Sequence, residues 1–280
     1  MPVLQSCLLH PMLDQDQRDR FDVVLVSPRN PLNIGAAARA MANFGFARLT
    51  VAGPYSPNWR EARSAVGAEE ILQNAQEAET LAGAVAACTL VAGTGTVTHR
   101  KPEQPVVNLP ALAPMLEREL ARGGRVALVF GQEKHGLTRE DLSFCHVLVE
   151  IPTDPRQPSM NLGQAVAVCL YELGGRETKE PSSQAEQLNQ GFDPAKTSPA
   201  GMGPCAAPSA ELDRLAGLIE ETMLAAHYSP PSMRAANGYD LRLMLRRLAL
   251  SSHDTRRILG LFRRILWRLA RGARSAGPKS

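Results

Sequence analysis

Apolar and polar residues alternate along residues 21–174 in a regular way. Five short, nearly continuous apolar runs are separated by longer segments in which apolar residues recur every three or four positions. Runs of this kind are typical of parallel strands covered on both faces, and the longer segments are typical of helices. The runs read FDVVLVS, ARLTVAG, CTLVAGTG, RVALVFG and HVLVEIP. This alternation predicts an α/β domain with a mainly parallel sheet and flanking helices.

The segments between the runs contain residues that begin and end helices. Asn33 to Phe44 is predicted as a helix, with Asn33 as its N-cap and Gly45 as its stop. Helical structure is also expected from about residue 58 to 85, interrupted near Gly67. Two further helices are predicted for LPALAPMLERELARGG and SMNLGQAVAVCLYELGG, and Thr138 opens a capping-box-like sequence before another.

The character of the chain changes after residue 175. Residues 176–209 are rich in Pro, Ser, Gln, Gly and Ala without periodicity, which predicts a flexible linker. The pattern then becomes helical again, with a turn expected near Asn237–Gly238. The last segment has an apolar stripe of Ile258, Leu261, Ile265 and Leu269. The predicted divisions are an N-terminal tail (1–19), a main domain (20–175), a linker (176–209) and a small all-α basic extension (210–275).

Composition adds the broad class of protein. The chain has 280 residues, is 44% hydrophobic and 21% charged, and contains no apolar run long enough to span a bilayer. Its first twenty residues make a poor signal peptide, its five cysteines are scattered, and its histidines have no metal-binding spacing. We therefore expect a cytoplasmic protein with reduced thiols that needs neither a membrane nor a metal.

The charge is unevenly distributed. The net charge is +3, but residues 241–280 hold eleven Arg or Lys and one acid and sum to +10, so residues 1–240 sum to −7. A basic end on an acidic body suggests a polyanionic partner. A solvated helix face is the alternative explanation and stays open at this point.

Three loops carry candidate chemistry, each at the carboxyl end of a predicted strand, where open α/β sheets bind ligands. The first contains Asn33 and Arg39, near a helix N-terminus that favours anions. The second is the glycine-rich loop GTGTVTHRKPEQP, which lacks a dinucleotide fingerprint. The third pairs FGQE, with Gly131 and Glu133, with PSMNL, which begins at Pro158. A surface arginine at 39 and a simple N-cap at Ser159 remain alternatives.

Together these loops resemble a known pattern. N-x-x-x-x-x-R after the first strand, F-G-x-E after a later strand and P-S-x-N-L opening the last helix resemble the SpoU/TrmH class of SPOUT RNA ribose 2′-O-methyltransferases. NIGAAARAMANFGF and PTDPRQPSMNLGQAVAV are most similar to the TrmJ branch, and so is the arginine-rich tail. The resemblance implies a knotted α/β fold, a homodimer, S-adenosyl-L-methionine as cofactor and tRNA as partner, with methylation of an anticodon-loop ribose, expected at position 32. Met160 departs from the branch, where Leu is usual.

The resemblance also implies roles for individual residues. Ribose-facing catalytic positions would be Asn33, Arg39, Ser159 and Asn161. Cofactor-binding positions would be Thr94, Gly95, Thr96, Gly131, Glu133, Ile151, Ser159, Met160 and Leu162. The basic tail would bind RNA through Arg246, Arg247, Arg256, Arg257, Arg263 and Arg264.

Other functions remain possible from the sequence. A SpoU-type enzyme that acts on ribosomal RNA or on another tRNA ribose is the alternative within the class. A catalytically silent RNA-binding protein on the same fold is an alternative of another class, disfavoured because the motif residues are all present. A nucleotide-dependent oxidoreductase is disfavoured by the missing phosphate fingerprint.

Overall fold

The computed structural model describes residues 13–95, 102–154, 156–174 and 205–275 of the chain. Thr96, most of the predicted linker and most of the predicted N-terminal tail lie outside these described residues. Within them, the main domain is built on a sheet of seven strands whose neighbours all run parallel, in the order β3-β2-β1-β6-β4-β7-β5. The strands are β1 (Phe21–Val26), β2 (Leu49–Ala52), β3 (Gln76–Ala78), β4 (Leu90–Thr94), β5 (Val106–Asn108), β6 (Val126–Phe130) and β7 (Val147–Glu150).

The five predicted strands are confirmed as β1, β2, β4, β6 and β7. All six residues of β1 and all five of β6 are buried, as their apolar runs predict. The prediction of one broken helix over residues 58–85 is wrong, because that segment contains β3 between two short helices. Strand β5 was also missed. Both are three-residue edge strands whose side chains are largely exposed, so neither carries an apolar run.

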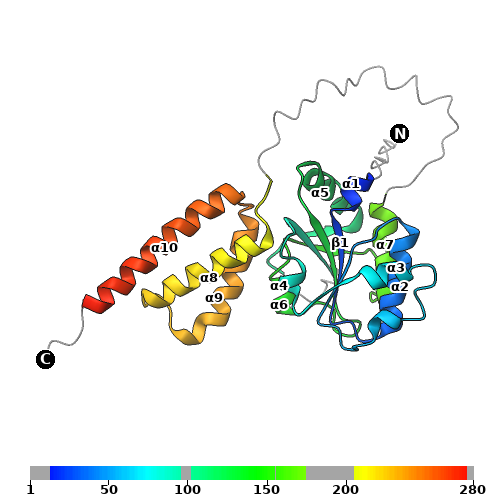
Figure 1. Cartoon of the computed structure of the whole chain (residues 1–280), viewed down its shortest axis with the longest axis horizontal. Helices are drawn as coiled ribbons and strands as arrows, with labels where there is room; N and C mark the ends of the chain where they lie inside the picture. The colour runs from blue at the N-terminus through cyan, green and yellow to red at the C-terminus, as the bar shows by residue number, and fades with distance from the viewer. Residues whose placement is uncertain (1–12, 96–101, 155, 175–204, 276–280) are drawn as a thin grey trace, which may run out of the picture.

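Helices cover both faces of the sheet, as Figure 1 shows. One face packs against α2 (Pro31–Asn43), α5 (Leu109–Ala121) and α7 (Leu162–Leu173), which together form the larger core around Phe21, Met41 and Leu170. The other face packs against α4 (Leu81–Ala84) and α6 (Arg139–Leu142) in a second core that includes Val24 and Val129. The remaining helices of the described main domain are α1 (Gln15–Arg18) and α3 (Glu69–Asn74), with a 3-10 turn at Trp59–Glu61.

The N-terminal end of α2 corrects one prediction. The N-cap is Asn30, whose side-chain oxygen accepts a hydrogen bond from the backbone N–H of Leu32 at 3.0 Å, and Pro31 occupies the first helical position. Asn33 therefore lies inside the first turn, where its side chain is free for another partner. The predicted stop is confirmed, since Gly45 follows the last turn with a φ of 73°, a conformation that favours glycine.

The C-terminal unit consists of α8 (Ser209–Ala225), α9 (Arg234–Arg247) and α10 (Ser252–Ser275), packed around Leu215, Leu245 and Leu259. The predicted turn near Asn237–Gly238 is wrong, because both residues lie inside α9. The chain turns earlier, where prolines 230 and 231 precede α9 and His227 has a φ of 54°. The Asn237 side chain donates to the Ser229 hydroxyl at 2.9 Å and so anchors this turn from within the helix.

The apolar stripe predicted for the last helix is only partly correct. Thr255 and Leu259 are buried and Phe262 packs against the core of the C-terminal unit, so the packed face is rotated from the predicted one. Leu261 is 58% exposed and Ile265 is 37% exposed. Every described helix is too short or too polar to cross a membrane.

Candidate active site

A cavity of about 270 Å³ opens at the carboxyl ends of β4, β6 and β7. Three segments surround it: the end of β4, the loop after β6, and the loop that joins β7 to α7. Ligands of open parallel sheets bind at this edge, in the crevice outside the carboxyl ends of the strands. The lining combines carboxylate, hydroxyl and backbone groups with the apolar side chains of Phe130, Ile151 and Met160.

Eight of the nine residues predicted to bind the cofactor line this cavity, and Thr96 lies outside the described residues. The eight are Thr94, Gly95, Gly131, Glu133, Ile151, Ser159, Met160 and Leu162. Thr94 is held in place because its hydroxyl donates to the Val129 carbonyl at 2.9 Å. Two of the three sequence motifs, F-G-x-E and P-S-x-N-L, therefore line one cavity together with the end of β4, although they are far apart along the chain.

Close backbone packing explains the glycine at position 131. A Cβ atom there would lie 2.2 Å from the carbonyl carbon of Gly136 and 2.2 Å from the nitrogen of Leu137. The loop can fold back on itself only without that carbon, and the Gly136 N–H then donates to the Gln132 carbonyl at 2.7 Å. The turn exposes Gln132 to Gly136 along one wall of the cavity.

A hydrogen-bond network joins the motifs through two asparagine side chains. Asn33 Nδ2 donates to Glu133 Oε1 at 3.0 Å, and Asn161 Nδ2 donates to Asn33 Oδ1 at 3.0 Å. The oxygen of Asn161 accepts from the backbone N–H of Gly163 at 2.9 Å, so Asn161 is the N-cap of α7. Ser159, the residue proposed above as a simple cap, has no such role and lines the cavity.

Glu133 is the acceptor at the centre of this network. Its carboxylate also accepts from the backbone N–H groups of Arg29 and Asn30, each at 3.1 Å. Burial by itself raises the pKa of Glu133, but the hydrogen bonds from Asn33 and from the backbone outweigh it and lower the pKa below its ordinary value. The group is therefore a fixed anion that locks the start of α2 to the loop after β6.

Arg39 is not part of the cavity in the single chain. Its side chain is exposed on α2, does not line the cavity, and forms no hydrogen bond or ion pair with any described residue. The structure thus brings Asn33, Glu133, Ser159 and Asn161 together and leaves Arg39 available to a molecule in solution.

Several cavity residues were not predicted from the sequence. Lys134 and His135 directly follow Glu133, the last residue of F-G-x-E, and Glu150 is the last residue of β7. Their places next to a motif or at the end of a strand were the features of the sequence that could have identified them as cavity residues. Phe130, Leu137, Thr153, Pro158 and Ala165 also line the cavity.

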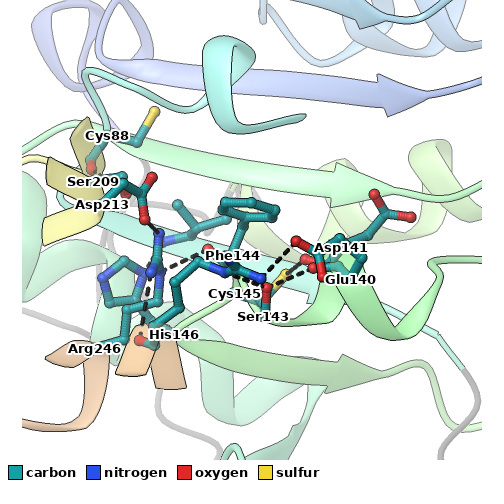
Figure 2. Close-up of polar contacts among 12 residues, drawn as sticks. Cys88, Glu140, Asp141, Ser143, Phe144, Cys145, His146, Ser209, Asp213 and Arg246 are labelled. Atoms are coloured by element: carbon teal, nitrogen blue, oxygen red, sulfur yellow. Dashed lines mark hydrogen bonds and ion pairs between the residues drawn. The ribbon is translucent and has the colours of Figure 1, made fainter. Parts of the chain in front are cut away.

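The structure corrects the prediction that Arg246 binds RNA. Its side chain is only 1% exposed, and it donates to Asp213 Oδ1 at 2.8 Å and to the Phe144 carbonyl at 3.1 Å. Figure 2 shows this guanidinium enclosed between Asp213 and the segment that joins α6 to β7. Arg242 of the same helix donates to the Ser143 hydroxyl at 2.8 Å and pairs with Glu140.

The other predicted RNA-binding arginines remain accessible. Arg247 is half-exposed, and its Nη1 atom lies 3.9 Å from Oε2 of Glu103. Those on α10, namely Arg256, Arg257, Arg263 and Arg264, are exposed.

The sheet is parallel and covered on both faces, and a cavity lined by two of the motifs and the end of β4 opens at its carboxyl edge, an arrangement typical of ligand-binding α/β proteins. A profile of the SpoU rRNA Methylase family matches residues 20–171, which hold all three motifs. The chain therefore belongs to the SpoU rRNA methylase family.

Individual relatives refine this placement. The chain is 42% identical over 156 residues to the tRNA (cytidine/uridine/adenosine-2′-O-)-methyltransferase TrmJ of Pseudomonas aeruginosa, a match that covers 55% of this chain and 60% of that protein. It is 31% identical over 247 residues to the tRNA (cytidine/uridine-2′-O-)-methyltransferase TrmJ of Escherichia coli K12, covering 87% of this chain and 92% of that protein. The crystal structure of TrmJ from Z. mobilis superposes with a TM-score of 0.70 at 29% identity, covering 87% and 98% of the two chains.

Proposed function

We propose that this chain is an S-adenosyl-L-methionine-dependent tRNA ribose 2′-O-methyltransferase that acts on a cytidine or uridine of the anticodon loop, at position 32. The observation that carries the proposal is that F-G-x-E and P-S-x-N-L line one cavity, and that the first motif is joined to both through the hydrogen bonds of Asn33 with Glu133 and Asn161. The similarity to the E. coli tRNA methyltransferase supports it because that match extends into the C-terminal helices.

The cavity fits a methionine-derived nucleoside in its chemistry. Phe130, Ile151 and Met160 offer an apolar wall for a base, and the backbone beside Gly131 can approach a bent ligand because no side chain intervenes. Thr94, Gly95, Gly131, Ile151, Met160 and Leu162 would hold the cofactor, with Glu133 fixing the loop beside it. When bound, the cofactor supplies an electrophilic methyl group on a sulfonium.

The residues of the chain would orient the ribose and stabilise charge. The side-chain amides of Asn33 and Asn161 hydrogen-bond to each other, to Glu133 and to the backbone of Gly163. In this arrangement they hold the three motifs in position. Ser159 lines the cavity without a cap to make, and we assign it to contact with the ribose.

Arg39 is assigned to electrostatic stabilisation. The side chain is exposed, so it can reach a phosphate or the oxygen of the attacking hydroxyl in a bound RNA. A guanidinium is a permanently charged donor without an acceptor, which disfavours a role as general base. We also assign a homodimer, in which Arg39 of one copy can serve a site completed by the other.

Methylation of a defined tRNA transcript tests the proposal. The purified chain and S-adenosyl-L-methionine should place one 2′-O-methyl mark in the anticodon loop, located by mass spectrometry. A transcript with a 2′-deoxy nucleotide at that position should not react. If the mark appears in ribosomal RNA fragments and not in tRNA, the enzyme is the alternative within the class. If the chain binds tRNA but methylates no RNA, the catalytically silent RNA-binding alternative is favoured.

Variants at position 39 test the assigned role. Arg39→Lys keeps the charge and loses the planar fork, so it should retain clearly more activity than Arg39→Ala. Arg118→Ala, which removes an exposed arginine from α5, is the matched control and should be fully active. Equal and near-complete loss in both Arg39 variants would argue against electrostatic stabilisation.

A further inference from the structure

Helix α10 has two faces of opposite character. Thr255, Leu259 and Phe262 face the core of the C-terminal unit. At 100° per residue, four arginines lie roughly opposite this packed face, and two more arginines and one aromatic residue, Trp267, lie on the adjoining flank. These arginines are all exposed: Arg256, Arg257, Arg263, Arg264, Arg268 and Arg271. We call this set, together with Trp267, the α10 arginine face.

The charges of α9 and α10 are used differently. Each arginine of α9 lies against an acid of a neighbouring segment: Arg234 with Glu220, Arg242 with Glu140, Arg246 with Asp213 and Arg247 with Glu103. The acid of α10, Asp254, lies in its first turn and accepts from the Ser251 hydroxyl at 2.7 Å. The positive charge of the basic tail is therefore presented to solvent mainly by α10, which projects beyond α8 and α9 in Figure 1.

Trp267 stands in the middle of this cationic surface. Its ring centre lies 4.7 Å from the guanidinium carbon of Arg271, 5.2 Å from that of Arg264 and 5.8 Å from that of Arg268. The side chain is 45% exposed, so it is not a core residue of the C-terminal unit. An aromatic ring held among guanidinium groups offers a base a stacking surface and offers the adjoining phosphates cations.

The alternatives for this surface fit less well. A second copy of the same face would bring six arginines against six others, and like charges in contact are unfavourable. Helix α10 does not contain an apolar stretch long enough to cross a membrane. RNA carries dense negative charge, which the arginines can bind, and unpaired bases, on which Trp267 can stack.

The resemblance already implies that arginines of the basic tail bind RNA. We propose that Trp267, which stands among the arginines of α10, stacks on an unpaired base of that RNA. This inference rests on the proposed function for the identity of the RNA. The arginines supply affinity that depends on salt, and Trp267 supplies a contact that requires a base outside a duplex.

Binding of the unmodified tRNA transcript to the full chain tests the inference. Trp267→Ala should weaken tRNA binding by roughly tenfold, and Trp267→Phe should keep most of the affinity because phenylalanine also stacks. Leu261→Ala is the matched control, since it truncates another exposed apolar side chain of α10 and should leave the affinity unchanged. Arg264→Gln should lower the slope of log affinity against log salt by about one, and Trp267→Ala should not change that slope.

A second measurement separates stacking from general attraction. In the chain labelled with 5-fluorotryptophan, RNA should shift the fluorine resonance of Trp267 and leave that of Trp59, which is 0% exposed, in place. A perfect RNA duplex should bind Trp267→Ala and the wild type equally, because it offers no free base.

Each contrary outcome has a definite meaning. Equal tRNA affinity of Trp267→Ala and wild type overturns the inference, and so does equal weakening of duplex binding. A change in oligomeric state by sedimentation without a change in RNA affinity also overturns it, in favour of a second copy. If the wild type methylates tRNA while Trp267→Ala binds normally, the inference fails and the proposed function stands. If the wild type binds tRNA through Trp267 but methylates nothing, the proposed function fails alone.

Discussion

Arg246 links the C-terminal unit to the main domain, because its guanidinium pairs with Asp213 of α8 and donates to the Phe144 carbonyl of the main domain. We predict that this one side chain makes a large contribution to holding the unit in place. Arg246→Ala removes a side chain that is 1% exposed and leaves two groups without their donor: the Asp213 carboxylate and the Phe144 carbonyl. It also removes the cation that lies 5.5 Å from the centre of the Phe144 ring. The substitution therefore leaves polar groups unpaired at an interface, the type of change that destabilises most.

The expected magnitude follows from the exposure of the partner. Breaking a fully buried ion pair costs about 3–5 kcal/mol. Asp213 is 24% exposed, so water can partly rehydrate its carboxylate after the arginine is removed. We therefore expect a loss near the lower end, about 3 kcal/mol. Arg247→Ala on the same helix should cost about 0–1 kcal/mol, because Arg247 and Glu103 are half-exposed and 3.9 Å apart.

Urea unfolding followed by fluorine NMR of 5-fluorotryptophan is the suitable assay. The chain has two tryptophans, Trp59 in the main domain and Trp267 in α10, so each resonance reports on one part of the molecule. Arg246→Ala should lower the free energy of unfolding reported by Trp267 more than that reported by Trp59. Combining Arg246→Met with Asp213→Leu should recover most of the loss, because an apolar pair leaves no charge unpaired. If Arg246→Ala costs no more free energy of unfolding than Arg247→Ala, the buried Arg246 guanidinium does not hold the unit in place, and the reasoning is refuted.

Two further predictions concern titration. The pKa of Glu133 is lowered in the folded protein, so its stabilisation is present above the unfolded pKa and is lost as the pH falls through the folded pKa. Glu133→Gln should therefore destabilise the chain by about 1–2 kcal/mol at pH 7, and the difference from wild type should vanish in acid, as measured by urea unfolding at several pH values. Burial, with the nearby charge of Arg246, lowers the pKa of His146 to about 3. The unfolded chain then takes up a proton below about pH 6.5 that the folded chain refuses, so stability falls by about 2 kcal/mol from pH 7 to pH 5. His146→Asn, whose amide oxygen can still accept from the Val91 N–H, should show a smaller fall, and an unchanged pH dependence would contradict the assignment.

The sequence predicted the centre of the fold better than its edges. The apolar runs of β1 and β6 are buried on both faces, and burial is what makes such a run visible. Strands β3 and β5 owe their conformation to pairing with a neighbour, since their own side chains are largely exposed. Periodicity cannot reveal a strand that is specified by its partner.

The candidate site shows the same division. Gly131, Glu133 and Ser159 could be placed at one cavity from their motifs, because the carboxyl ends of parallel strands share an edge. The roles of the two asparagines could not, because they depend on where each helix begins. Asn30 caps α2, which frees Asn33 to bridge Glu133 and Asn161, and a shift of three residues in the predicted cap concealed that bridge.

Formal charge alone could not separate the tail arginines that pair with acids from those that are exposed to solvent. Arg246 and Arg264 count equally in the sum for residues 241–280, but one is buried against an aspartate and the other lies on an outward face. The division depends on acids elsewhere in the chain, since Glu140 and Glu103 belong to the main domain and meet α9 only in the folded structure.

Arg242 and Arg246 contact residues 140–144 of the main domain. This segment connects the loop after β6 to strand β7, and both the loop and the end of β7 line the cavity. One set of tail arginines thus fixes the C-terminal unit beside the walls of the cavity, and the other set, on α10, is exposed to solvent at that fixed place.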